Sequence, residues 1–185
     1  MVDWDLTEPE QRLWEAFPSG EWVDLRSGDT ERAVRGEVLT ALLLGAAGDE
    51  PGRRPAVRVR GAVVTGRLDL MGSTAVCPLV CEHCHFENPL RFVEATTGTV
   101  RLVDCEMPSV NAARLNARGI VNLHRSRVDG GLRFDRATIA GDIVLIGTEV
   151  GADAEGVALA AEGLVVDGNC SKTRRSLTAI SPGVR

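Results

Sequence analysis

Apolar and small residues in the middle of the chain recur in pairs that are two residues apart, and a new pair begins every five or six residues. The second members of the first four pairs are Val59, Val64, Leu70 and Ala75. This spacing is neither the 3.6-residue period of a helix that faces a core nor the two-residue period of a long strand. It is typical of a repeat protein in which each short segment supplies one wall of a solenoid.

Four successive pairs make one turn of about 21 residues, and the turns should stack at the strand spacing of about 4.8 Å. The pattern therefore predicts an all-β solenoid with a small α-helical cap, in the form of a four-sided parallel β-helix over residues 57–166. Phe86, Phe92, Met107 and Phe134 should fill its lumen, and His83, His85, Arg101 and His124 should lie outside. The four predicted columns are Val59, Cys81, Leu102, Leu123 and Leu145; Val64, Phe86, Met107, Val128 and Val150; Leu70, Phe92, Ala112 and Phe134; and Ala75, Thr97, Ala117 and Ile139.

Residues 1–56 have a different pattern and are predicted to form an N-terminal helical cap and linker. Glu8–Phe17 and Thr30–Ala47 have the periodicity of helices, with Asp29 as the candidate N-cap of the second. An open solenoid end exposes apolar columns and unpaired backbone groups, which such helices would cover. Trp4, Trp14 and Trp22 are therefore interpreted as packing residues of the cap rather than as ligand contacts.

The other end of the solenoid has no predicted helix. Val157, Leu159, Leu164 and Val166 continue the apolar pattern, and residues 167–185 have the composition of a polar tail. An uncovered last turn favours a twofold partner that stacks on the same surface. We therefore predict a homodimer through the C-terminal turn, with a monomer whose tail folds back as the alternative.

Segments such as RGAVVTGRLDLMGS and RSRVDGGLRFDRATIAGDIVL give the chain a family resemblance. The solenoid resembles the pentapeptide-repeat proteins, and this resemblance implies a right-handed, four-sided β-helix. The chain is also similar to a bacterial group of degenerate pentapeptide-like proteins often labelled membrane-associated oxidoreductases. The first resemblance implies DNA mimicry directed at a type II topoisomerase as one possible function, and the second implies an oxidoreductase.

Charge argues against a nucleic-acid-like or nucleic-acid-binding surface. The net charge of −5 comes from residues 1–56, which hold 12 acidic and 6 basic residues, whereas residues 57–150 hold 10 and 11. A solenoid this close to neutrality is a poor imitation of DNA and a poor polyanion binder. The acidic start is unlike a signal peptide, and the longest apolar run, Val38–Ala47, is too short to span a membrane. A cytoplasmic protein with reduced cysteines is expected.

The densest candidate chemistry is CPLVCEHCHF, which contains Cys81, His83, Cys84 and His85. Such a cluster invites a zinc interpretation, because zinc is bound by four converging sulfur and nitrogen ligands. The predicted register points both cysteines into the lumen and both histidines outward, so that core thiols and surface imidazoles are favoured over a metal site. A disulfide between Cys84 and Cys105 would be strained, because their Cβ vectors are nearly parallel.

No catalytic or cofactor site emerges from the remaining motifs. The sequence has no GxSxG, GxGxxG or GxxxxGK[ST] motif, and no cofactor is predicted. Outward carboxylates are interpreted as solvated, and outward arginines would hold an acidic partner only if nearby acids left them uncompensated. The leading hypothesis is a non-enzymatic interaction or scaffold protein with an unidentified protein partner. The carboxylates are Asp69, Glu87, Asp104 and Asp135, and the arginines are Arg58, Arg60, Arg91, Arg101, Arg133 and Arg136.

Overall fold

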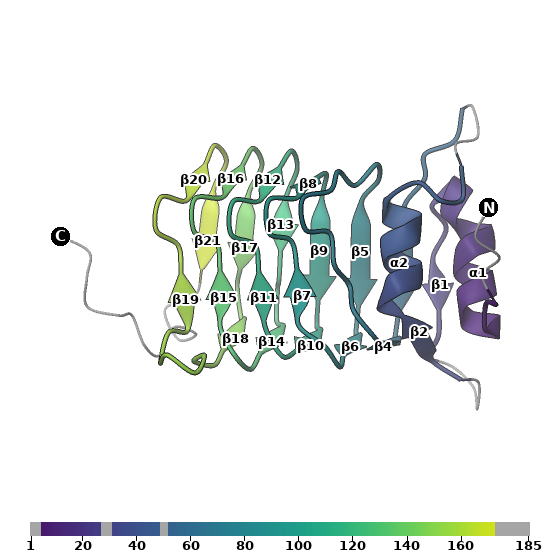
Figure 1. Ribbon diagram of the computed structural model, residues 1–185, viewed down its shortest axis with the longest axis horizontal. Coiled ribbons are helices and arrows are strands. Elements are labelled where there is room, and N and C mark those ends of the chain that lie inside the picture. The colour runs from purple at the N-terminus through teal and green to yellow at the C-terminus, as the bar shows by residue number, and fades with distance from the viewer. Residues whose placement is uncertain (1–4, 27–30, 49–51, 173–185) are drawn as a thin grey trace.

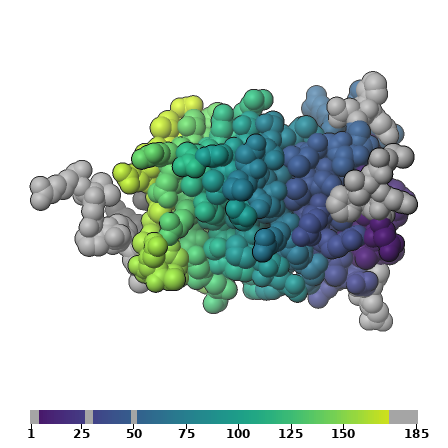
Figure 2. All heavy atoms as spheres, viewed as in Figure 1, coloured from purple at the N-terminus to yellow at the C-terminus, as the bar shows by residue number. Residues whose placement is uncertain are grey.

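The computed structural model describes residues 5–26, 31–48 and 52–172, and it shows a parallel β-solenoid with helices at its N-terminal end (Figure 1). The chain winds through four parallel sheets, which are called side one to side four in the order in which each turn visits them. Successive turns lie next to one another along the long axis of the molecule (Figure 2). The predicted solenoid is therefore confirmed.

The complete turns contribute one short strand to each side, and the turn that contains β3 and β4 reaches sides three and four through single bridges at Asp69 and Thr74. The helices are α1 (Glu8–Ala16), the 3-10 helix η1 (Phe17–Ser19) and α2 (Gly36–Leu43). Side one consists of β1 (Val23–Asp24), β3 (Val57–Arg60), β5 (Leu79–Glu82), β9 (Val100–Val103), β13 (Val121–Asn122), β17 (Ile143–Leu145) and β21 (Cys170–Lys172). Side two consists of β2 (Ala33–Arg35), β4 (Val63–Thr65), β6 (His85–Phe86), β10 (Glu106–Met107), β14 (Arg127–Val128) and β18 (Glu149–Val150). Side three consists of β7 (Leu90–Arg91), β11 (Val110–Asn111), β15 (Leu132–Arg133) and β19 (Leu159–Ala160), and side four of β8 (Thr96–Thr97), β12 (Asn116–Ala117), β16 (Thr138–Ile139) and β20 (Val165–Val166).

The observed register agrees with the columns predicted from the sequence. On side one Val59 pairs with Cys81 and Cys81 with Leu102, and on side four Ala117 lies between Thr97 and Ile139. The predicted lumen residues Phe86, Phe92, Met107 and Phe134 are at most 2% exposed. His83, His85 and Arg101 are exposed as predicted. His124, which was also predicted to be exposed, is half-buried, because Val103 and Ile146 lie on either side of it in the same outward column.

The N-terminal region differs from the prediction in its second helix. The first helix, α1, is observed where it was expected, but the predicted helix Thr30–Ala47 is replaced by β2 followed by the shorter α2. Val34 pairs with Val64 and so fills a lumen position on side two. A Cβ atom on Gly36 would lie 2.5 Å from the backbone of Arg67, so the helix can begin only at a glycine. The candidate N-cap Asp29 lies outside the described residues.

The cap is joined to the solenoid through shared sheets, and within the cap an ion pair with a buried carboxylate ties α1 to β2. Both β1 and β2 extend the solenoid sheets toward the N-terminus, so the cap supplies part of a first turn. The Glu10 side chain is 1% exposed and accepts hydrogen bonds from the Arg35 backbone and guanidinium at 2.6 to 2.9 Å. Trp14 packs against the core, and Trp22 lies 3.9 Å from the Arg60 guanidinium. Trp4 lies outside the described residues.

Two corners of each turn pass through the left-handed region of backbone space. The corner after side one and the corner after side three both have φ values between 52° and 71°, and six of these positions are not glycine. Left-handed geometry costs such a residue roughly 1–2 kcal/mol. The non-glycine residues are His83, Asp104 and Arg125 at the first corner and Glu94, Arg114 and Arg136 at the second.

One buried hydroxyl in the lumen lacks a hydrogen-bond partner within the described part of the chain. Thr97 is 2% exposed, and its Oγ1 atom contacts no donor or acceptor. Replacing a buried, unsatisfied hydroxyl by a methyl group of the same shape removes its desolvation cost. We expect Thr97→Val to raise the free energy of unfolding by about 1 kcal/mol, as measured by urea denaturation. A decrease would show that the hydroxyl has a partner.

The last described turn extends beyond the predicted boundary at residue 166. After Val150 the chain makes a loop in which Asp153 accepts backbone hydrogen bonds from Glu155 and Val157 at 2.9 Å. It then returns through β19 and β20 to β21, which pairs with β17 on side one. Residues 170–172 therefore belong to the sheet. The rest of the predicted tail, residues 173–185, lies outside the described residues.

Candidate functional site

The cysteine and histidine cluster is divided by the solenoid wall, as the register predicted. Cys81 and Cys84 are buried in the lumen at 0% and 2% exposure, whereas His83 and His85 are exposed on the outside. Among the described residues no group of three or more His, Cys, Asp or Glu side chains is arranged to hold a metal ion. The candidate ligands Cys81, Cys84, His83 and His85 are therefore not brought together as a set.

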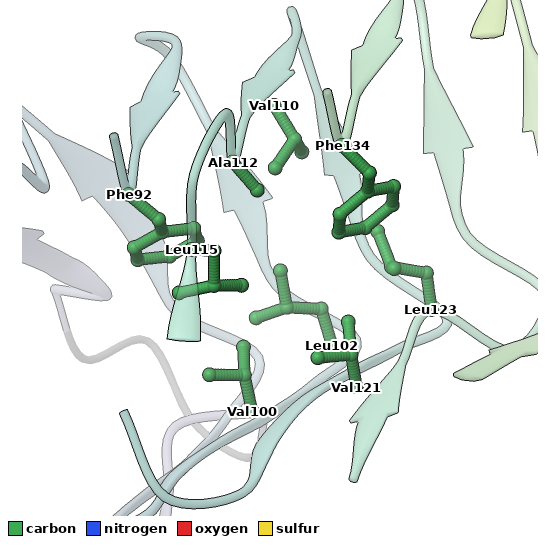
Figure 3. Close-up of a pocket in the computed structure, with 9 residues that line it drawn as sticks. All are labelled: Phe92, Val100, Leu102, Val110, Ala112, Leu115, Val121, Leu123 and Phe134. Carbon is green, nitrogen blue, oxygen red and sulfur yellow. The ribbon is translucent and has the colours of Figure 1, made fainter. Parts of the chain in front are cut away.

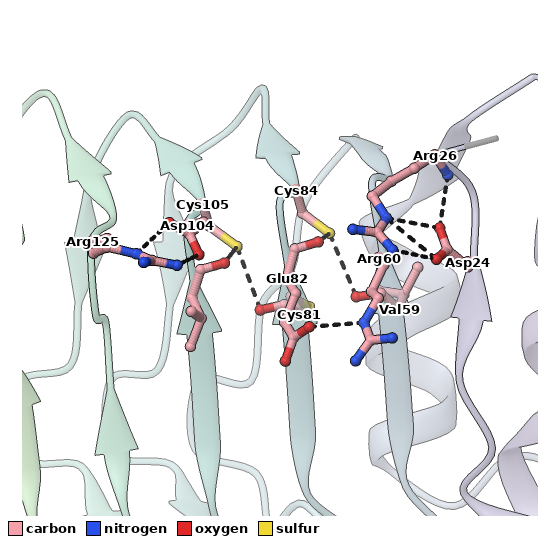
Figure 4. Close-up of polar contacts among 11 residues, drawn as sticks. Asp24, Arg26, Val59, Arg60, Cys81, Glu82, Cys84, Asp104, Cys105 and Arg125 are labelled. Atoms are coloured by element: carbon pink, nitrogen blue, oxygen red, sulfur yellow. Dashed lines mark hydrogen bonds and ion pairs between the residues drawn. The ribbon is translucent and has the colours of Figure 1, made fainter.

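The buried thiols of Cys84 and Cys105 lie at the corner between sides one and two, next to the thiol of Cys81 on β5 (Figure 4). Hydrogen bonding with Cys84 and burial both raise the pKa of Cys81 and of Cys105. A raised pKa keeps a thiol protonated and unreactive at neutral pH. No disulfide joins the cysteines of the described chain, and these three thiols serve as small core residues.

A column of small polar residues at this corner holds each turn to the preceding one. Its members are equivalent residues of successive turns, and each donates a hydrogen bond to the carbonyl oxygen of a side-one lumen residue on the turn before. The donors and acceptors are Cys84 to Val59 at 3.8 Å, Cys105 to Cys81 at 3.5 Å, Ser126 to Leu102 at 2.8 Å and Thr148 to Leu123 at 2.7 Å. These hydrogen bonds depend on the corner geometry, which the spacing of residues in the sequence does not show.

The other residues considered for chemistry lie on the outer surface in pairs between turns. Asp69 accepts a hydrogen bond from Arg91 at 2.8 Å, and Asp104 accepts two from Arg125. His85 lies 3.3 Å from Glu106. Glu87 is exposed, and Asp135 accepts a backbone hydrogen bond from Glu162. These contacts link one turn to the next along the outer wall.

Three of the six outward arginines singled out in the sequence are compensated by acids. Arg60 donates to Glu82 at 2.8 Å, Arg91 pairs with Asp69, and Arg133 pairs with Asp153 at 2.5 Å. The other three, Arg58, Arg101 and Arg136, form no ion pair with any described residue. Nearby acids therefore neutralise half of the six arginines, as the sequence led us to expect, and leave the other half without an acidic partner among the described residues.

The uncompensated arginines are unevenly distributed. Arg58 and Arg101 share one outward column on side one, whereas Arg136 lies at the corner after side three. Side two has the opposite character, because most of the charged side chains on its solenoid turns are acidic. From β6 onward its charged residues are the acids Glu87, Glu106, Asp129 and Glu149 and the base Arg127, which is bonded to Asp129 at 2.7 Å. Arg35 of β2 is paired with Glu10 of the cap. Sides one and two, which are neighbours, thus differ in the sign of their uncompensated charge.

The described part of the lumen contains a small apolar void (Figure 3). The void has a volume of about 10 Å³ and lies between Phe92 and Phe134, where Ala112 occupies the same column. A dry apolar space of this size holds no ligand. The outer surface has a shallow groove of about 240 Å³ on side two, beside Arg127, Asp129 and Glu149.

Comparison with protein-family models, with curated proteins and with solved structures finds no match. The parallel solenoid is compatible with a repeat β-helix, and the likeness to pentapeptide-repeat proteins remains a resemblance of sequence pattern. The helices within the described residues are too short and too polar for any of them to cross a bilayer.

Proposed function

We propose that this protein is a non-enzymatic, cytoplasmic interaction protein that uses the outer wall of its solenoid as a scaffold surface. The observation that carries this proposal is the strand register. Equivalent positions of successive turns lie next to one another, so that the outward side chains form regular columns. Solenoids commonly use such extended surfaces to bind partner proteins. The uncompensated arginines of side one provide binding groups for such a partner.

A photo-crosslinking experiment tests this proposal directly. A photoreactive amino acid is placed on each side in turn, at Asn122 on side one, Glu106 on side two, Asn111 on side three and Asn116 on side four. We expect one protein to be crosslinked from one side only, in cells that produce the full chain. Crosslinks that are absent or evenly spread over all four sides would contradict a scaffold role.

The oxidoreductase alternative rests on the label of the resembling group alone. It requires a bound redox cofactor, and a flavin would give the purified protein a visible absorption spectrum. The DNA-mimic alternative is less well supported than the scaffold, because the acidic side chains do not cover the solenoid and side one carries the uncompensated Arg58 and Arg101. Supercoiling by a type II topoisomerase in the presence of the purified chain tests that alternative.

We further propose a homodimer through the C-terminal turn. In the described chain β18, β19, β20 and β21 each pair with a strand on one side only, and Val165 is 51% exposed. Leu164 and Val166 are only partly buried, although their column neighbours Ala137 and Ile139 are completely buried. A second copy would cover these strand edges and apolar side chains.

Light scattering on the full chain and on Leu164→Asp tests the dimer. We expect a dimer for the unaltered chain and a monomer for the variant, because a carboxylate would be desolvated in the shared surface. Circular dichroism must show that the variant keeps its fold. A monomeric unaltered chain would exclude the dimer.

A further inference from the structure

Side one carries an outward column in which two arginines lack an acidic partner. Arg58 pairs in register with Val80, and Val80 with Arg101, so the two arginines are separated by two strand spacings. With strands about 4.8 Å apart, their Cα atoms are about 9.6 Å apart along the solenoid axis. Both side chains are exposed, and Val80 between them is only 7% exposed. The column therefore offers two guanidinium groups on arginines whose Cα atoms are held at a fixed separation.

The second outward column of side one leaves these charges uncompensated. Both acids of this column already have partners. Asp24, which is in register with Arg60, is bonded to Arg26 at 2.6 Å. Glu82 is bonded to Arg60, whose guanidinium also stacks on Trp22 at 3.9 Å. Beyond Glu82 the column continues with Val103, His124 and Ile146, and Ile146 is 41% exposed. The surface that faces a partner is thus basic at one end and aliphatic toward the other. A complementary partner has carboxylates together with apolar side chains.

We propose that side one binds an extended acidic segment of a partner protein, which lies along the solenoid axis in the polyproline II conformation. This conformation rises about 3.1 Å per residue with three residues per turn, so residues three apart lie about 9.3 Å apart on the same face. That separation matches the distance between Arg58 and Arg101. Carboxylates three residues apart each meet one guanidinium, which donates planar paired hydrogen bonds to a carboxylate. The proposal rests on the scaffold function proposed above and specifies its surface and its ligand.

The same surface is a poor match for nucleic acid. Affinity for a polyanion depends on many phosphate contacts, and side one offers two uncompensated arginines among aliphatic residues. A phosphate backbone that extends past the edge toward side two would meet Glu87, Glu106 and Glu149, which repel it. The two uncompensated arginines on side one and the acids on side two therefore favour a short acidic peptide over a nucleic acid.

Synthetic peptides test the proposed spacing. Fluorescence anisotropy is measured with labelled (Glu-Pro-Pro)4, with the neutral (Gln-Pro-Pro)4 and with (Glu-Pro)4, which has the same number of carboxylates at a two-residue spacing. We expect the first peptide to bind, its affinity to fall with added salt, and the other two to bind at least about tenfold more weakly, as the loss of two ion pairs implies. Equal binding of (Glu-Pro)4 would overturn the spacing, and no binding of (Glu-Pro-Pro)4 would overturn the proposal.

Matched substitutions test the surface. The double variant Arg58→Gln/Arg101→Gln should lose about tenfold in affinity for (Glu-Pro-Pro)4. The control is Arg118→Gln, which removes an exposed arginine from side four that forms no ion pair with the described residues, and it should bind as the unaltered chain does. Equal losses in both variants would show a non-specific charge effect and overturn the proposal. Tighter binding of single-stranded oligonucleotides than of the peptide would overturn it in favour of nucleic acid.

The crosslinking experiment separates this proposal from the scaffold function. If the unaltered chain crosslinks to a partner from side one and the double arginine variant does not, both are supported. If the partner is crosslinked from another side, or is retained by the double variant, the scaffold function stands and the acidic-segment proposal fails. If the unaltered chain crosslinks to no partner while (Glu-Pro-Pro)4 still binds, the scaffold function fails and the surface assignment stands.

Discussion

Phe134→Ala should lower the free energy of unfolding by about 4 kcal/mol, near the upper end of what the truncation of a buried phenylalanine costs. The ring is 1% exposed, and its column neighbours on the adjacent turns are Ala112 and Ala161. Neither alanine has a side chain that can move into the space left by the ring. The new cavity would join the void that already exists beside Ala112. The cost depends on how far a site can collapse, and this site is held open by paired strands.

Two further truncations provide reference values for the loss of stability in Phe134→Ala. Phe92 lies between Ala112 and Leu70, so one larger neighbour borders its space, and Phe92→Ala should cost less than Phe134→Ala. Val76 is 56% exposed, and Val76→Ala should change stability by no more than about 0.5 kcal/mol. Urea denaturation followed by circular dichroism measures all three. A loss below about 1 kcal/mol for Phe134→Ala would mean that its ring does not support the core.

The sequence was sufficient to predict the solenoid because its signal is repeated. Each lumen position recurs in several turns, so that a column such as Val59, Cys81 and Leu102 is visible without any knowledge of contacts. The same logic placed the cysteines inside and His83 and His85 outside. The division of the CPLVCEHCHF cluster by the wall therefore followed from register alone.

The structure departed from the sequence prediction where pairing with a distant segment decides the conformation. Val34, Val38 and Leu42 have helical spacing, but Val34 belongs to β2 because β4 offers it a partner strand. Local periodicity cannot detect such a partner, since tertiary pairing overrides propensity. The left-handed corners were missed for a related reason: glycine marks this geometry in the first turn at Gly61 and Gly72, but charged residues occupy it in the middle turns.

The imbalance of charge between sides could be found only after the register was known. Counts along the chain gave a nearly neutral solenoid, because the acids of side two and the arginines of side one alternate in sequence. In the folded solenoid these acids and arginines lie on different sides. Which arginines are compensated depends on the neighbouring turn: Glu82 lies beside Arg60, whereas the residue beside Arg58 is Val80.

Glu10→Gln should weaken the attachment of helix α1 to β2 and lower the free energy of unfolding by about 3 kcal/mol at neutral pH, because it removes a buried carboxylate that accepts hydrogen bonds from Arg35 and Thr7. The Glu10 carboxylate accepts hydrogen bonds from the Thr7 backbone at 3.0 Å, from the Arg35 backbone at 2.9 Å and from the Arg35 guanidinium at 2.6 and 2.8 Å. The glutamine side chain has the same shape but provides one acceptor oxygen and no charge. The expected control is Glu8→Gln on the same helix, where the carboxylate is 59% exposed and pairs with Arg12 at 3.7 Å, with a change below about 0.5 kcal/mol.

The pH dependence of stability distinguishes the charge of Glu10 from its packing. Burial alone would raise the pKa of Glu10, but hydrogen bonds from Arg35 and Thr7 outweigh it and lower the pKa below the ordinary value of 4.5. A carboxyl group whose folded pKa is lowered contributes stability that is complete above its unfolded pKa and is lost as the pH falls through the folded value. The difference in stability between the unaltered chain and Glu10→Gln should therefore be constant above pH 4.5 and shrink below it. Asp24, Asp104 and Asp153, whose pKa values are also lowered, are present in both proteins and cancel in the difference. A difference that stays constant down to acid unfolding would show that Glu10 acts by shape alone.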